Sequence, residues 1–460
     1  MVPLRFFNLP RTRVRALISL LTLCCGLSLN AQDLTSPLLS DSWQATFSNP
    51  ALYGRARSRL TVGLPGLTND LYVENLSYNQ LVTDEDGRRI LNLSAVPDLL
   101  ANRNELRNDS SVETIGVGMK GDRFAVGLYH RARLSGRIDY PKTLVELAAR
   151  GNAAFIGQTV EVAPLGQLTS YHEIGLGASV TITPKIHLGG RIKYLSGIAD
   201  LRTAAGGSLQ LTTGTENYAL TLDQELTVNS AGSLNYESLD DIDFNYDLNR
   251  ISTDKLFSGN NGLAFDLGLF GDFDKLRVQL AATDLGGRIE WTNEVTNLRF
   301  TGSDTFSGLD ILDRVFEDSL SLSSAVDSVK LTFEPGEDGN AYTSNLAATY
   351  LVGGEYDVTD RLTAGLLIVH FARPVNPETA VAVSARYRVI DAVTVGLNYN
   401  ARKGAPFNLG GHLYARLGPV NLLASTDNLL TVFNQKNNSR ASFRLGAFLS
   451  IGKIIERERE

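Results

Sequence analysis

Side chains of alternating character run from Tyr171 to Tyr194, with one interruption at Thr183-Pro184. One face of the first stretch is apolar and consists of Ile174, Leu176, Ala178, Val180 and Ile182. The other face is small or polar and consists of Tyr171, Glu173, Gly175, Gly177, Ser179 and Thr181. Two alternating stretches of about ten residues, joined by a tight turn, are typical of a transmembrane β-hairpin with one face toward lipid. Strands of soluble sandwiches are usually shorter, about five or six residues.

The same pattern recurs along the chain. Five more short turns separate alternating runs, at Lys120–Asp122, Gly271–Lys275, Asp357–Asp360, Val389–Ala392 and Gly418–Pro419. With Thr183–Pro184 they predict six hairpins, and a first strand near Ser58–Leu64 and a last strand near Phe443–Ile451 bring the count to about fourteen. Bacterial single-chain barrels have an even number of antiparallel strands. We therefore expect an all-β chain that forms a transmembrane antiparallel β-barrel of about 14 strands.

The connections on the opposite side are long, and we expect them to be extracellular. They are Pro65–Ser111, Ala132–Ser170, Ser196–Asn261 and Leu285–Thr343. Alternation inside the third connection predicts strands that project beyond the membrane, although it also permits a count of sixteen. Two connections carry apolar residues at helical spacing, Thr143–Ala154 and Leu309–Phe316. Such a helix either folds into the lumen or caps the loops.

The amino terminus is typical of a secretory signal peptide, predicted to span residues 1–31. Four arginines precede an apolar stretch, Ala16–Leu29, that is too short to cross a bilayer comfortably. The only cysteines, Cys24 and Cys25, lie within this leader, so we expect neither a disulfide nor thiol catalysis. Loss of the four arginines changes the net charge from −7 to −11, which argues against nucleic acid as a partner. We assign 32–57 to an amino-terminal periplasmic segment, 58–452 to the barrel and 453–460 to a charged periplasmic tail.

Motifs of catalysis are missing from the sequence. It contains no P-loop, dinucleotide fingerprint, HExxH or GxSxG pattern. No histidine has another histidine three or four residues away, so a structural or lumen-lining role is favoured over metal ligation. We expect no enzyme activity, no cofactor and no metal site.

Basic residues fall on the polar faces of the predicted strands and point to a basic lumen. The ones selected as candidates are Arg123, Arg131, Arg191, Lys193, Arg277 and Arg416. A basic channel attracts anions such as a carboxylate headgroup. The alternative, which we favour, is that these side chains pair with acidic residues inside the barrel, because every polar interior needs partners.

Three segments resemble known barrel families. Residues 171–179 with 192–197, and the motif Asp284–Trp291, are similar to a Bacteroidota family of predicted outer-membrane barrels of unknown function. Ser48-Asn49-Pro50-Ala51 resembles the Asn-Pro-Ala element of FadL-type transporters and of PorV-like barrels of type IX secretion. The resemblance implies a fourteen-stranded barrel whose segment Asp33–Arg57 plugs the lumen, with Asn49, Pro50 and Ala51 in plug contacts. An equal alternative is a simple turn at Asn49-Pro50 before the first strand.

Two functions remain open for an outer-membrane barrel of a Gram-negative bacterium. The first is passive uptake of small hydrophobic or amphipathic compounds, including anionic ones, through a plugged FadL-like lumen. The second is a non-conducting structural or partner-binding barrel, associated with secretion or with attachment of surface proteins. Partners are thus outer-membrane lipid and either a small ligand or a secretion-system or surface protein.

Overall fold

The computed structural model describes residues 34–85, 88–91, 95–216, 218–238, 241–244, 256–306, 334–374, 376–403, 405–433 and 438–452. The predicted leader, the predicted helix Leu309–Phe316 and the predicted tail 453–460 lie outside the described residues. Among the described residues, no helix is long and apolar enough to cross a membrane.

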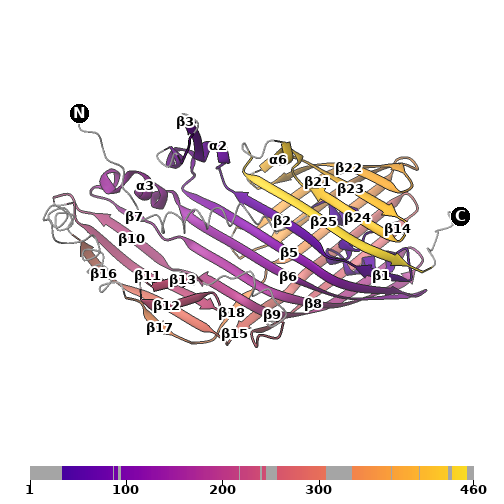
Figure 1. Cartoon of the computed structure of the whole chain (residues 1–460), viewed down its shortest axis with the longest axis horizontal. Coiled ribbons are helices and arrows are strands. Elements are labelled where there is room, and N and C mark those ends of the chain that lie inside the picture. Colours follow the sequence, from indigo (N-terminus) through magenta and orange to yellow (C-terminus); the bar gives the residue numbers. More distant parts are fainter. Residues whose placement is uncertain are drawn as a thin grey trace.

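A closed barrel of 14 antiparallel strands confirms the predicted fold (Figure 1). Each strand of the barrel wall is here called a stave. The first stave consists of two short strands, interrupted at Leu64-Pro65. Leu60 pairs with both Met119 and Ile451 and so closes the ring. The staves are β1 (Leu60–Gly63) with β2 (Gly66–Val73), β5 (Arg103–Lys120), β6 (Phe124–Pro141), β8 (Leu165–Thr183), β9 (Ile186–Thr203), β14 (Asn261–Phe273), β15 (Leu276–Trp291), β19 (Ala348–Asp357), β20 (Leu362–Ala372), β21 (Glu378–Ile390), β22 (Val393–Arg402), β23 (Ala405–Leu417), β24 (Val420–Thr426) and β25 (Arg440–Ile451).

All six predicted hairpin turns join neighbouring staves at one end of the barrel, which we call the short-turn end. The turn at Thr183-Pro184, for example, joins β8 to β9, and Ile174 pairs with Tyr194 across that hairpin. A shift of one residue would exchange the two faces of a strand, so the alternating pattern determines this register. Leu176 and Ile192, predicted to face lipid, are 55% and 44% exposed on the outside.

Replacing Leu176 by arginine is expected to impair assembly of the barrel. A charge on the lipid face at mid-bilayer costs about 2–4 kcal/mol, because the guanidinium loses its water. Quantification of folded protein in outer-membrane fractions tests this, with Leu176→Ala as the control. Equal amounts of the two variants would show that Leu176 does not face lipid.

A polar sheet extends the wall on one side, beyond the ends of β9 and β15 (Figure 1). The alternation in the connection Ser196–Asn261 thus belongs to projecting strands and not to a fifteenth and sixteenth stave. The extension contains β7 (Thr159–Glu161), β10 (Ser208–Thr213), β11 (Leu220–Ala231), β16 (Val295–Phe306) and β17 (Gly336–Asp338). Additional short strands are β3 (Val82–Glu85), β4 (Arg88–Leu91), β12 (Leu234–Ser238), β13 (Asp241–Phe244) and β18 (Tyr342–Asn345).

Small helices cap the loops at the end of the barrel opposite the short turns. The predicted helix at Thr143–Ala154 is present as α3 and η5, and Val145 packs against the loop cluster of Leu76, Val96 and Leu100. It is therefore a cap and not a constriction. Arg150 donates a hydrogen bond to Asp98, which lowers the pKa of that carboxyl. The helices here are α2 (Tyr78–Leu81), η4 (Val96–Leu99), α3 (Lys142–Arg150), η5 (Asn152–Phe155) and α6 (Leu429–Phe433).

Candidate functional site

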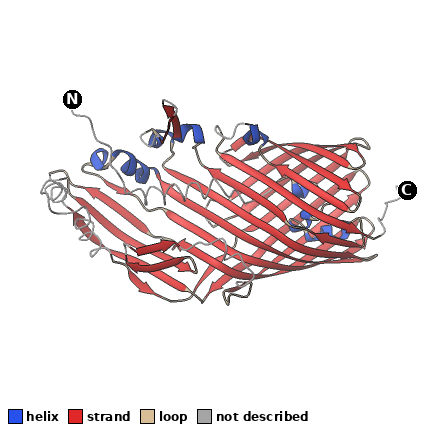
Figure 2. Cartoon of the chain, viewed as in Figure 1, coloured by secondary structure: helices blue, strands red, loops and turns tan. Residues whose placement is uncertain are grey.

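The chain from Leu34 to Arg57, here called the N-terminal segment, lies inside the barrel (Figure 2). It forms three 3-10 helices, η1 (Ser36–Leu38), η2 (Gln44–Phe47) and η3 (Pro50–Arg55), whose residues are all buried. Leu34 N donates to Asp427 Oδ2 over 3.1 Å, just past the far end of β24. The segment thus reaches from the short-turn end, where it enters β1, to the other end of β24.

Glycines on the inner face of the wall make room for this segment. A Cβ on Gly189 would lie 2.2 Å from Ala51 N, and a Cβ on Gly268 would lie 2.9 Å from Pro50 Cδ. Since any side chain at these positions would overlap the segment, the small inner face of the predicted hairpin is explained by what it contacts.

Two aromatic side chains of the segment lie on further glycines. The indole of Trp43 covers three of them, and the ring of Tyr53 covers two. In each case a Cβ on the glycine would lie within 3 Å of the ring, namely on Gly63, Gly116 and Gly118 for Trp43 and on Gly127 and Gly177 for Tyr53. Large aromatic surfaces buried in this way stabilise the position of the segment.

The predicted Asn-Pro-Ala motif forms both a helix start and a wall contact. Asn49 Oδ1 accepts a hydrogen bond from Ala51 N over 3.0 Å and so caps η3, with Pro50 at its first position. Asn49 Nδ2 donates to Leu269 O over 3.2 Å on β14. The motif therefore has two roles: it turns the chain into η3, and it attaches the segment to the barrel wall.

Polar side chains of the wall donate to backbone carbonyls of the segment. Arg191 Nη1 and Nη2 reach Thr46 O at 3.0 Å and Phe47 O at 2.9 Å. Near η1, Gln279 Nε2 donates to Pro37 O over 2.8 Å. These bonds satisfy carbonyls that would otherwise be buried without a partner.

Seven charged side chains meet inside the wall of β6, β8, β9, β14 and β15, in what we call the central charge cluster. Glu173 accepts from Arg131 Nε at 2.9 Å, and Lys193 Nζ lies 2.8 Å from Asp266 and 2.7 Å from Asp284. The cluster has four cations and three carboxylates and consists of Arg131, Arg133, Glu173, Arg191, Lys193, Asp266 and Asp284. It thus has a formal excess of one positive charge.

The six basic candidates lie in three different environments. Three of them, Arg131, Arg191 and Lys193, belong to the central charge cluster. Arg277 pairs inside the barrel with Glu355 at 2.9 Å and with Asp357. Arg416 Nη2 donates to Asp391 O over 2.8 Å at the short-turn end, and Arg123 is exposed at the turn before β6. Four of the six are thus paired with acidic residues.

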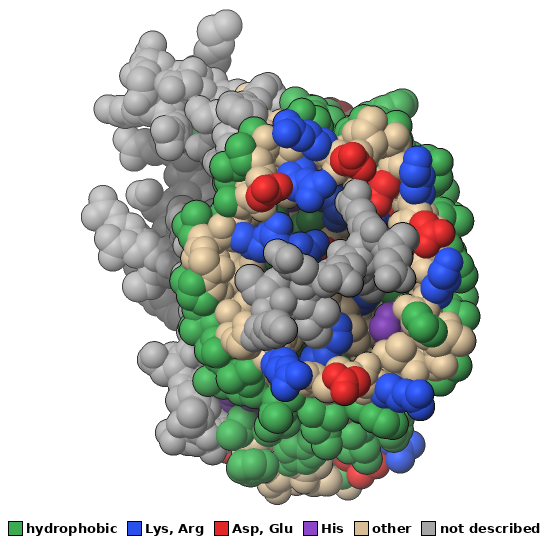
Figure 3. Space-filling view, turned by 90° about the vertical axis from the view of Figure 1, so that its right-hand side faces the viewer, with side chains coloured by type: hydrophobic (Ala, Val, Ile, Leu, Met, Phe, Trp, Pro, Cys, Tyr) green, Lys and Arg blue, Asp and Glu red, His purple; other side chains and the backbone are tan. Residues whose placement is uncertain are grey.

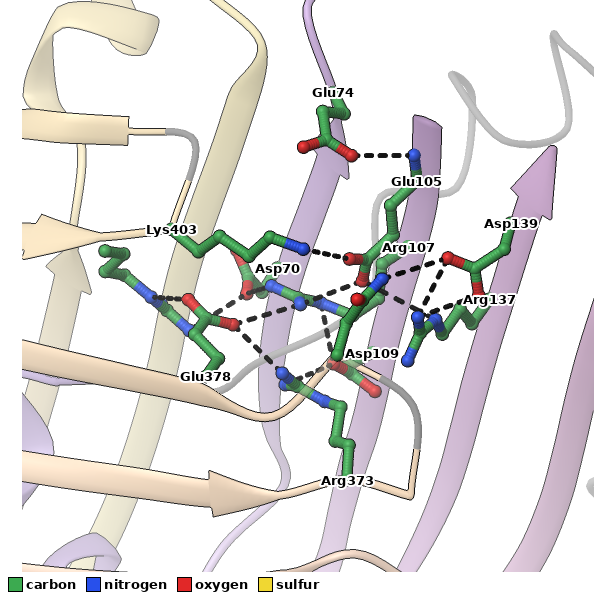
Figure 4. A network of polar contacts seen from close by, with 12 residues as sticks. Asp70, Glu74, Glu105, Arg107, Asp109, Arg137, Asp139, Arg373, Glu378 and Lys403 are labelled. Atoms are coloured by element: carbon green, nitrogen blue, oxygen red, sulfur yellow. Dashed lines mark hydrogen bonds and ion pairs between the residues drawn. The ribbon is translucent and has the colours of Figure 1, made fainter. Parts of the chain in front are cut away.

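A second group of charges lies at the end of the barrel away from the short turns (Figure 4). Glu378 lies 3.0 Å from each of Arg107, Arg373 and Arg402. Asp70 accepts from Arg440 Nε over 2.8 Å, 370 residues further along the chain. This outer charge network was missed by the sequence analysis, because its partners come from staves that are distant in sequence and carry no common motif.

Two histidines that are isolated in the sequence also meet across neighbouring staves. His130 Nε2 lies 3.1 Å from His172 Nδ1, and Thr114 Oγ1 lies 2.8 Å from His130 Nδ1. Among the described residues, no group of three or more His, Cys, Asp or Glu side chains is arranged to hold a metal ion.

Residues 50–427 match the family of unknown function DUF5723. The chain belongs to this family. The region matched by the DUF5723 family includes Pro50, Ala51, the hairpin of β8 and β9 and the motif Asp284–Trp291, which confirms the predicted membership in an unknown-function family. No curated protein matches the sequence.

Solved structures similar to this DUF5723 member include FadL-type barrels. A Pseudomonas aeruginosa FadL homologue is 11% identical, with 89% of this chain and 94% of that chain covered and a TM-score of 0.42. The P. putida toluene transporter TodX is 10% identical, with the same coverages and a TM-score of 0.42. Similarity at this level identifies no substrate for the DUF5723 member.

Proposed function

We propose that this protein is an outer-membrane channel of a Gram-negative bacterium, in the Bacteroidota as the resemblance implies, and that it admits small hydrophobic or amphipathic compounds. In this proposal the N-terminal segment plugs the lumen at rest. The main support is that the segment occupies the interior but contributes no stave, so it can shift while the ring of paired strands stays closed.

Charge inside the barrel favours compounds with an acidic group. The central charge cluster has one more cation than carboxylates, and Arg191 contacts the segment through two backbone carbonyls and the hydroxyl group of Tyr53. When the segment shifts, both donors become available to a carboxylate, which a guanidinium binds with two parallel hydrogen bonds.

A reversible lock tests the proposal. A Cβ on Gly446 would lie 3.0 Å from Gln44 Cγ, so cysteines at both positions have Cβ atoms within disulfide reach. The rest of the predicted mature chain has no cysteine to interfere. We expect cells that make the Gln44→Cys/Gly446→Cys protein to take up the hydrophobic probe N-phenyl-1-naphthylamine faster after reduction than after oxidation.

Cells with Gln44→Cys alone serve as the control for the reductant. Equal uptake rates before and after reduction of the locked protein would contradict a gate formed by the segment. That result would favour the second candidate, a non-conducting partner-binding barrel with a PorV-like role in secretion or surface attachment. The close fit of Trp43 and Tyr53 to wall glycines and the projecting sheet speak for this candidate.

A further inference from the structure

A hollow lies at the short-turn end, between the N-terminal segment and the wall of β23, β24, β25, β1 and β5. It contains about 690 Å³ of space, including its mouth, which is open to solvent. Figure 3 looks at this end of the barrel, where Lys and Arg side chains gather within the rim.

Four aromatic rings are among the residues that line the hollow. Trp43 and Tyr53 from the segment pack in one cluster with Phe448 from the wall, and the partly buried Tyr414 packs against that cluster. The rings of Tyr414 and Phe448 are stacked, with centroids 6.4 Å apart and planes 16° apart. The parts of these rings that line the hollow form a flat apolar surface, which favours a planar apolar group beside it.

Two guanidinium groups line the same hollow, and they differ in their partners. Arg57 is paired with Asp41, which also accepts from Arg55 at 3.2 Å. Arg416 donates to the carbonyl oxygen of Asp391. Within the described part of the chain, no carboxylate lies within 4.0 Å of the Arg416 guanidinium. The hollow therefore has one cation without a carboxylate partner.

We infer that this hollow binds a small aromatic monoanion, with its ring beside Trp43, Tyr414 and Phe448 and its acidic group on Arg416. A guanidinium binds a carboxylate through charge-assisted hydrogen bonds, and the surrounding rings hold the apolar part of the ligand. The site goes beyond the proposed channel, because its mouth opens at the short-turn end and a ligand can enter it without crossing the lumen.

Fluorescence of Trp43 provides the test. The chain has two tryptophans, and Trp291 lies in a separate core beside Tyr342. In full-length mature Trp291→Phe protein, titration with phenylacetate is expected to change the Trp43 emission to saturation, whereas neutral phenylacetamide binds more weakly. Arg416→Gln is expected to weaken phenylacetate binding about tenfold, as for the loss of one charge-assisted hydrogen bond.

Arg388→Gln is the matched control, because Arg388 also donates to the carbonyl of a neighbouring turn, that of Asp360, but does not line the hollow. Equal affinities of the Arg416 and Arg388 variants, or no saturable change with phenylacetate, would overturn the inference. If the Trp291→Phe protein fails to fold, calorimetric titration of the unaltered mature chain with phenylacetate measures the same binding. Since binding is measured without a membrane gradient, failure here is distinct from failure of the channel proposal.

Discussion

Gly189→Ala is expected to displace the N-terminal segment from the wall. The added methyl carbon would lie 2.2 Å from Ala51 N and 2.4 Å from Pro50 C, and these are backbone atoms of a capped helix that cannot rotate away. Overpacking of this kind typically costs about 1–3 kcal/mol, occasionally more. We expect faster proteolysis within the segment and a lower denaturant midpoint for the barrel, both measured on purified folded protein.

Gly190→Ala is the control for this experiment. The neighbouring residue points to the other face of β9, where its added carbon would lie 3.9 Å from Asp266 O, an ordinary van der Waals distance. The two variants carry the same chemical change one residue apart. Equal proteolysis rates for both variants would contradict the contact between the segment and β9.

Glu173→Gln is expected to destabilise the folded barrel by about 3–5 kcal/mol, the range for removal of one partner from a buried ion pair. Glu173 is fully buried and accepts hydrogen bonds from Arg131, Arg133 and Tyr129. The substitution keeps the shape of the side chain and raises the formal charge of the central charge cluster from one to two. The free energy of unfolding in guanidinium chloride, with detergent or lipid held constant, measures the effect.

The control for this substitution is Glu290→Gln on β15. Both members of the pair Glu290–Arg288 are more than half exposed and lie 3.8 Å apart, so solvent screens their attraction. We expect a change of about 0–1 kcal/mol. A cost for Glu173→Gln no larger than that of Glu290→Gln would mean that the central charge cluster does not stabilise the barrel.

The staves were predictable because each carries its own signal. Alternation from Tyr171 to Tyr194 gives both the strands and their register, since a slip of one residue would turn Leu176 into the lumen and Glu173 toward lipid. The turn at Thr183-Pro184 needs only local chemistry. Likewise, the helical spacing of Thr143–Ala154 was sufficient for α3, whose place as a cap depends on contacts with distant loops.

Contacts between distant staves were not predictable in the same way. The pairing of Asp70 with Arg440 depends on closure of the ring, which brings β2 beside β25. Similarly, no local pattern distinguishes Gly189 and Gly268 from the other glycines of the chain, and their role becomes visible only once Pro50 is seen against them. The positions of the basic residues on polar strand faces also gave no indication of which of them, such as Arg123 and Arg416, would lie outside the ion-paired interior.

Single-channel conductance in planar bilayers tests the central claim that the N-terminal segment closes the lumen. The mature chain from Gln32 is compared with a chain that begins at Ser58, after insertion of both has been verified. The account predicts steady ionic current through the shortened barrel and little or none through the intact one. The absence of current through both inserted proteins, or equal currents through both, would contradict it.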